Sequence, residues 1–132
     1  METQTAEHPA RSAKACAARL NAIHDAIYAI GGKWKLKIII VLREEGSKRF
    51  NELQRLVTGI SARVLSNELR ELELNGFVIR KVYDGRPVVV EYELTDYSDT
   101  LGGVLHALDA WGTMHREKIR SEMQAAANSE TK

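Results

Sequence analysis

Hydrophobic residues recur at helical spacing over much of this chain. A first amphipathic helix is predicted to end at Gly31-Gly32. Its apolar residues lie three and four positions apart: Leu20, Ile23, Ile27 and Ile30. Residues 34–42 predict a second helix that is apolar on most sides and therefore buried on several faces.

Two shorter amphipathic helices follow, over residues 51–57 and 62–74. Gly59, in the connection between them, supplies a backbone position without a Cβ, which suits a tight turn between helices. Ser61 is expected to cap the second of these helices, and Asn75-Gly76 is expected to end it. The buried side of that helix is predicted to hold Leu65, Leu69 and Leu72.

The spacing then changes to that of β-strands. Residues 77–83 alternate in character, residues 84–87 are typical of a hairpin turn, and residues 88–94 are rich in β-branched side chains. A short strand is also predicted at residues 48–50. A helix, a tight turn, a second helix and a hairpin, in this order, predict a winged helix-turn-helix of the α+β class, mostly α.

The winged helix-turn-helix is expected to have an added helix at each end. The last one begins near residue 96, and its apolar stripe reaches Ile119. We expect one domain over residues 16–120, because a chain of this length suits one hydrophobic core. Residues 1–15 are expected to form a flexible N-terminal arm, and residues 121–132 a frayed C-terminal tail.

The polar side of the helix over residues 62–74 is a candidate for reading DNA in the major groove. Arginine can pair with guanine and asparagine with adenine, and a small residue at the helix start allows close approach to the bases. The expected contacts come from Ala62, Arg63, Ser66, Asn67 and Arg70. An ordinary solvated helix face is the alternative, and this face taken alone favours it.

The hairpin changes that balance. Lys81 and Arg86 put positive charge on a protruding loop, so residues 80–90 are expected to contact the DNA backbone or the minor groove as a wing. The alternative is an edge hairpin whose charges prevent aggregation. Lys48, Arg49 and Ser61 are expected to help fix the helices on the phosphate backbone.

The two terminal helices carry more apolar surface than one small core needs. We expect them to form a homodimer interface, and packing within one chain is the alternative. The expected interface residues are Leu20, Ile23, Ile27, Leu101, Val104, Leu105, Leu108 and Trp111. A two-fold dimer would hold its recognition helices roughly 34 Å apart, which matches a palindromic operator in double-stranded DNA.

The formal net charge is only +1, but its distribution favours a nucleic-acid partner. Residues 31–86 contain twelve Lys and Arg against seven Asp and Glu, a net of +5, whereas residues 87–132 contain four against eight, a net of −4. The basic excess therefore lies in the segment that carries the helix pair and the hairpin.

The sequence disfavours several other classes of function. The longest apolar run, residues 38–42, is far too short to span a membrane, and a cytoplasmic location is the default. The four histidines lack metal-ligand spacing, so we expect no metal and no other cofactor. No acid–base or nucleophile constellation is present, so an enzyme is not expected.

Cys16, the only cysteine, is a candidate redox sensor. Lys14 and Arg19 near it would favour the reactive thiolate, whereas inert hydrophobic packing of the thiol is at least as good an interpretation. With a single cysteine, sensing would need a disulfide between subunits or with a small thiol.

Many motifs of the chain, in order, resemble the HxlR family of bacterial transcriptional regulators. The resemblance covers roughly residues 16–115 and rests on Gly31-Gly32-Lys33-Trp34, Arg49-Phe50-Asn51-Glu52-Leu53, Gly59-Ile60-Ser61, Leu65, Leu69-Arg70-Glu71-Leu72-Glu73, Asn75-Gly76, Val90-Glu91-Tyr92-Glu93-Leu94-Thr95, Leu105, Leu108 and Trp111-Gly112. It implies a MarR-like winged-helix dimer that acts at promoters, with the first and last helices as its interface. It also implies oxidant or electrophile sensing at a position like Cys16 in some members, although Ala17 stands here where the family usually has proline.

Two other functions remain open at this level. A protein-interaction module would use the winged helix without DNA, and its binding would be insensitive to salt. A small-molecule effector, bound between the dimer helices and the DNA-binding lobes, is compatible with regulation and would raise the melting temperature.

Overall fold

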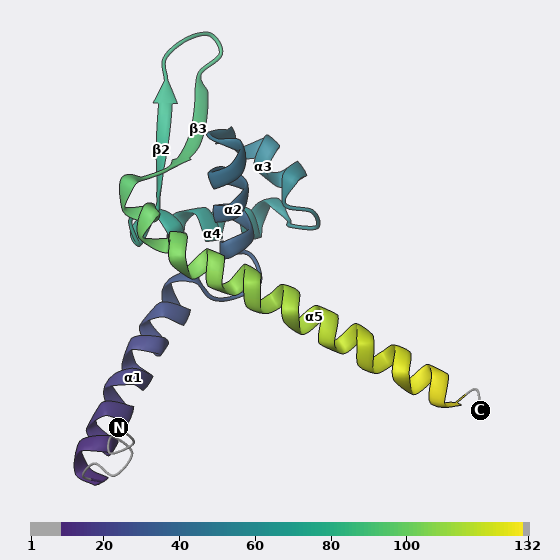
Figure 1. Cartoon of the computed structure of the whole chain (residues 1–132). Coiled ribbons are helices and arrows are strands. Elements are labelled where there is room, and N and C mark those ends of the chain that lie inside the picture. The colour runs from purple at the N-terminus through teal and green to yellow at the C-terminus, as the bar shows by residue number, and fades with distance from the viewer. Residues whose placement is uncertain (1–8, 131–132) are drawn as a thin grey trace. The chain divides into compact units, whose positions relative to one another are not determined.

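The structure, a computed structural model, describes residues 9–130, with side chains from residue 12 onward. The chain divides into two compact units between Thr95 and Asp96. The elements of the first unit are α1 (Pro9–Ile30), α2 (Lys35–Glu45), β1 (Lys48–Arg49), α3 (Phe50–Leu56), α4 (Ala62–Leu74), β2 (Val78–Tyr83) and β3 (Val89–Leu94). The second unit consists of the 3₁₀ helix η2 (Asp96–Leu101) and the long helix α5 (Gly102–Glu130) (Figure 1).

The core of the first unit lies where α2, α3 and α4 pack together and against the root of the hairpin. Ile38 and Ile39 of α2 and Leu53 of α3 are almost fully buried. The predicted inner face of α4 is confirmed, because its three leucines are buried as well: Leu65, Leu69 and Leu72. This packing fixes which side of α4 points outward.

A three-stranded antiparallel sheet in the order β1-β3-β2 forms the wing. The hairpin register runs from Val78 opposite Leu94 to Tyr83 opposite Val89. The short β1 pairs with the other side of β3, with Lys48 opposite Tyr92 and Arg49 opposite Glu91. The expected short strand is therefore confirmed, and it joins the residues before α3 to the base of the wing.

The winged helix-turn-helix architecture, with a helix added at each end, agrees with the fold expected from the sequence. Several element limits differ from that expectation. α1 begins at Pro9, inside the expected arm, because proline suits the first helical position and the alanines that follow are strong helix formers. α5 likewise continues to Glu130, through the alanines at 125–127, and does not end at residue 120.

The start of the last helix also differs from the expectation. A 3₁₀ helix spans Asp96–Leu101, and the α-helix begins only at Gly102. Thr100 Oγ1 donates a hydrogen bond to the carbonyl oxygen of Tyr97, 2.8 Å away, within this tighter turn. The remaining residues of the expected arm and tail, 1–8 and 131–132, lie outside the described residues. The division into arm, domain and tail stays a prediction.

Candidate nucleic-acid interface

α4 presents a polar face on the side away from the core. Arg63, Ser66, Asn67 and Arg70 are exposed, as is Ala62 at the helix start. Ser61 caps the helix as expected, since its Oγ accepts a hydrogen bond from the backbone N–H of Val64 over 3.2 Å. The sequence-predicted reading residues therefore share one accessible helix face, and their contact with DNA stays a prediction.

The turn before α4 depends on Gly59. Its φ is +90°, a conformation that residues with a Cβ rarely adopt. A Cβ at this position would lie 3.8 Å from Cη2 of Trp34, so the indole packs close against the turn. The ammonium groups of Lys33 and Lys37 lie 4.8 and 5.1 Å from the centre of the Trp34 ring, which places two cations beside the helix pair.

The start of α3 is held by a short hydrogen bond. Oε1 of Glu52 accepts from the backbone N–H of Arg49 over 2.8 Å, and this bond holds the pKa of the Glu52 carboxyl below its usual range. Nearby positive charges from Lys48, Arg49 and Arg55 act in the same direction. Arg49 is exposed, whereas Lys48 is half-buried, with its Nζ 4.0 Å from Glu45.

The wing carries one lysine that is paired with a glutamate and two further exposed arginines. Nζ of Lys81 lies 2.8 Å from Oε2 of Glu93, whose Oε1 accepts a hydrogen bond from Ser47 over 3.0 Å. The Lys81 pair raises the pKa of the lysine and, together with Ser47, lowers that of Glu93. Arg80 and Arg86 are exposed on the hairpin. Lys81 thus pairs across the hairpin, and Glu93 links the hairpin to the loop that precedes β1. The DNA contact predicted for Lys81 stays a prediction.

One charged residue near this surface was missed in the sequence. Lys35, in the first turn of α2, is only 7% exposed. Its Nζ lies 2.8 Å from Oε1 of Glu68 and 2.6 Å from Oε1 of Glu71, both on α4. The available signal was its spacing, since Lys35 precedes Ile38, Ile39 and Leu42 by three, four and seven positions and so falls on their buried stripe.

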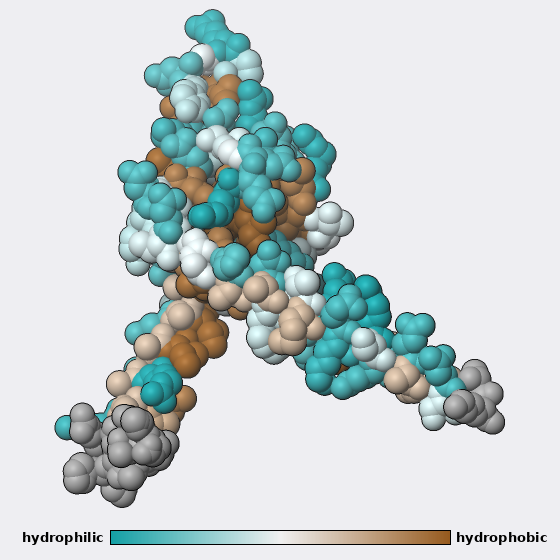
Figure 2. Space-filling view, viewed as in Figure 1, coloured by the Kyte–Doolittle hydropathy of each residue, from teal (hydrophilic) through white to brown (hydrophobic). Residues whose placement is uncertain are grey.

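The residues predicted for a dimer interface are mostly open in the single chain. Leu20, Ile23 and Ile27 of α1 are 63%, 49% and 63% exposed, and hydrophobic residues, coloured brown, are visible on the surface of this helix in Figure 2. On α5, exposed side chains include Val104, Leu108 and Trp111, whereas Leu105 is half-buried and Leu101 is buried. Leu101 and, in part, Leu105 are therefore covered within the single chain, and a dimer partner for the predicted residues stays a prediction.

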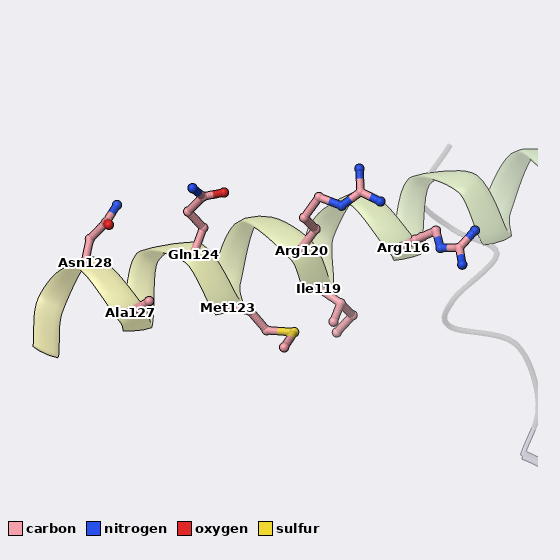
Figure 3. Close-up of a pocket in the computed structure, with 7 residues that line it drawn as sticks. All are labelled: Arg116, Ile119, Arg120, Met123, Gln124, Ala127 and Asn128. Carbon is pink, nitrogen blue, oxygen red and sulfur yellow. The ribbon is translucent and has the colours of Figure 1, made fainter.

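The apolar stripe of α5 continues beyond Trp111 into its last turns. Ile119, Met123 and Ala127 lie four residues apart and point to the same side of the helix, whereas Arg120, Gln124 and Asn128 point to another (Figure 3). Because a single helix supplies all of these residues, they form an open face and not an enclosed cavity. Cys16 is exposed on α1.

The described residues were also compared with the requirements of a membrane span and of a metal site. Among residues 9–130, no helix is long and apolar enough to cross a membrane. Within the same residues, no three His, Cys, Asp or Glu side chains are grouped as they would have to be to hold a metal ion.

Comparisons with known proteins extend over most of the chain. The family model described as HxlR-like helix-turn-helix matches residues 29–120. YtcD of Bacillus subtilis strain 168, named as an HTH-type transcriptional regulator, is 46% identical over 90 residues, which cover 68% of this chain and 71% of YtcD. YdeP of the same organism carries the same description and is 41% identical over 103 residues, which cover 78% of this chain and 79% of YdeP.

Solved structures show the same architecture. The crystal structure of YtcD superposes with a TM-score of 0.69 at 43% identity and covers 72% of this chain and 96% of that one. The redox regulator HypR in its reduced form superposes with a TM-score of 0.70 at 38% identity, and the match covers 76% of this chain and 98% of HypR. The reduced form of YodB from Bacillus subtilis superposes with a TM-score of 0.63 at 37% identity, and the match covers 68% of this chain and 87% of YodB. These similar proteins are named as regulators, and none as an enzyme.

Proposed function

The chain belongs to the HxlR-like helix-turn-helix family of transcriptional regulators, and from that premise we propose that it binds operator DNA as a homodimer. α4 would enter the major groove, and the hairpin of β2 and β3 would contact the backbone or the minor groove beside it. We also propose a cytoplasmic location, because the DNA that it would bind lies there.

The observation that carries this proposal is the separation of the two sides of α4. Its leucines are buried in the core, so the helix cannot turn its polar side inward. The outward side offers two guanidinium groups, an amide and a hydroxyl, which are the groups that pair with base edges and phosphates. Arg86 on the wing and Arg49 before α3 add exposed positive charge on neighbouring elements.

Dimerisation is supported by the apolar side chains that remain exposed in the single chain. A soluble monomer rarely leaves a contiguous apolar stripe along a helix uncovered. α1 and α5 each carry such a stripe, and a second copy of the chain would bury it. Two copies related by a two-fold axis would then bind a palindromic operator, with half-sites about one DNA turn apart.

The test is selection of bound sequences from a pool of random duplexes, followed by titration of the selected duplex at several salt concentrations. We expect a palindromic sequence and an affinity that falls steeply with salt, since each phosphate contact releases counterions. Failure to enrich any sequence, with binding that is independent of salt, would overturn the proposal and favour a protein-interaction module.

A redox response is a second candidate. The solved relatives include proteins named as the redox regulator HypR and as reduced and diamide-treated YodB. Cys16 is exposed on α1, four residues before Leu20 on the proposed interface. We expect an oxidant to release the wild-type protein from DNA and to leave Cys16→Ser bound. Equal release of both proteins would exclude Cys16 as the sensor.

A small-molecule effector is the remaining response to test. Screening of small molecules by melting temperature would reveal an effector as a ligand-dependent rise. Release of the operator by the same molecule would identify it as an inducer.

A further inference from the structure

Lys35 connects the buried helix α2 to two carboxylates of α4. Its ammonium group lies within 2.8 Å of both Glu68 and Glu71 and is shielded from solvent. A buried ammonium group without a partner would be costly, so these contacts are needed for Lys35 to stay charged where it is. Burial alone would lower the pKa of Lys35, but the hydrogen bonds and charges of Glu68 and Glu71 outweigh it and raise the pKa above its ordinary value.

The two glutamates are on the helix that we propose as the DNA reader. Glu71 follows Asn67 by four positions, so the two side chains are neighbours on the surface of α4. The Glu71 side chain is also 55% exposed. An unpaired carboxylate at this place would repel DNA phosphates beside the predicted base contacts.

The contacts also constrain the orientation of α4. Glu68 and Glu71 lie three residues apart, and both reach the same nitrogen atom of α2. Rotation of α4 about its axis would lengthen these contacts. The outward direction of Arg63, Asn67 and Arg70 is thus coupled to the position of Lys35.

We propose that Lys35 is a positioning residue for DNA recognition, an inference that rests on the proposed function. It fixes the rotation of α4, offsets one of the two negative charges of Glu68 and Glu71, and keeps both carboxylates turned toward α2. Lys35 does not itself touch DNA in this arrangement. Its contribution reaches the DNA through the two glutamates.

The first test compares Lys35→Met with wild type on the selected operator duplex, at salt concentrations from about 50 to about 300 mM. We expect Lys35→Met to weaken binding by at least about tenfold at the lowest salt, because two carboxylates then face the DNA without a cation. The ratio of the two affinities should shrink as salt rises, since added ions screen this repulsion. A purely structural role would give a ratio independent of salt.

A rescue variant separates charge from packing. Lys35→Met combined with Glu68→Gln and Glu71→Gln removes the whole charge cluster and so leaves no buried charge without a partner. We expect the triple variant to recover most of the affinity that Lys35→Met loses. A loss that the triple variant does not recover, or that salt does not change, would overturn the proposal.

Lys118→Met is the matched control. Lys118 is also paired with a glutamate, with its Nζ 2.7 Å from Oε2 of Glu122, but it lies on α5 outside the helix-turn-helix. Equal affinities of Lys118→Met and Lys35→Met would overturn the proposal. Failure of the wild-type protein to bind any duplex would instead overturn the proposed function, so the two failures are distinguishable.

If Lys35→Met does not fold, the comparison uses Lys35→Gln with Glu68→Gln. This double variant removes one charge of each sign and leaves Glu71 without its cation. We expect a salt-dependent loss smaller than that of Lys35→Met, because one carboxylate and not two is left without the cation that held it toward α2, and we expect Glu71→Gln to reverse it. Wild-type affinity of the double variant would overturn the proposal.

Discussion

At the scale of residues, neighbouring positions of α4 have opposite environments. Leu65 and Leu69 are buried and hold the helix in the core, whereas Ser66, Asn67 and Arg70 are exposed. The period of the helix produces this sorting, because residues three and four apart share a face. Core packing and the proposed recognition therefore fall on different residues of the same helix, and each can be tested separately.

Recognition should respond differently to arginines on α4 and on the wing. We expect Arg63→Ala to weaken operator binding by about 1–3 kcal/mol and to relax sequence preference, because its guanidinium would pair with a base. Arg86→Ala should weaken binding to all duplexes alike, since a phosphate contact carries no sequence information. Titration of operator and scrambled duplexes with both variants provides the comparison. Unchanged affinity in both variants would contradict the predicted contacts.

Stability should respond to the buried leucines. Leu65→Ala should lower the free energy of unfolding by about 2–5 kcal/mol, because it leaves a cavity at a fully buried position. Leu74→Ala is the control on the same helix, since Leu74 is 80% exposed, and it should change stability by less than about 0.5 kcal/mol. Urea denaturation followed by circular dichroism measures both. Similar losses in the two variants would show that α4 is packed differently.

At the scale of elements, local signals predicted α4 better than any other part of the chain. Ser61 and Asn75-Gly76 marked its ends, and the structure has the helix over the expected residues, 62–74. The pairing of β1 with β3 was beyond such signals, because it joins residues more than forty positions apart. The contact of Lys35 with α4 was missed because it also joins residues that are far apart in the sequence, although the place of Lys35 on the apolar stripe of α2 was visible.

α1 and α5 extend into the expected arm and tail for a different reason. Polar composition and the absence of a long apolar stripe favoured an arm and a tail. Alanine propensity instead carries both helices outward, to Pro9 and to Glu130. The candidate DNA-binding face was predictable from helical period alone, whereas the ion pairs around Lys81 and Lys35 depend on the tertiary structure.

The cap of α3 gives an element-scale prediction in acid. The folded-state pKa of Glu52 is lowered by its hydrogen bond to the Arg49 backbone, whereas its unfolded value is about 4.3. Its charge therefore contributes stability above the unfolded pKa, and the contribution is lost as pH falls through the lower folded pKa. Glu52→Gln keeps an acceptor without the charge, so it should melt below wild type at neutral pH.

Melting curves of both proteins between neutral pH and about pH 3 give the measurement. The difference in melting temperature should disappear in acid, where Glu52 of the wild type is protonated. The same substitution at exposed Glu44 of α2 is the control for a general change in charge. A difference that grows on acidification would contradict the assignment of the cap.

At the scale of the whole molecule, exposed apolar side chains on α1 and α5 are the main feature without a partner in the single chain. Trp111 is 60% exposed and stacks on His115, with 4.8 Å between the ring centres. Ile27 and Leu108 are exposed to a similar degree. The proposed homodimer accounts for these residues together.

Introducing a charge on the stripe of α5 should therefore yield monomers. Leu108→Glu would bury an unpaired carboxylate in the proposed interface, which the dimer cannot accommodate without a large cost. Ala110→Glu, exposed and off the stripe, is the matched control and should remain dimeric. Sedimentation velocity distinguishes the two states. A wild-type protein that sediments as a monomer at all concentrations would contradict the interface.

The two-residue strand β1 has a further consequence for how a bound duplex would be read. It ties the start of α3 to β3, while β3 pairs with β2 along the wing. α4, the proposed reading helix, itself contacts β2. We therefore expect α4 and the wing to move together when they adjust to DNA. A duplex whose minor groove has the wrong width beneath the wing would pull α4 out of register with its bases. The protein would in this way be sensitive to the shape of base pairs that it never touches.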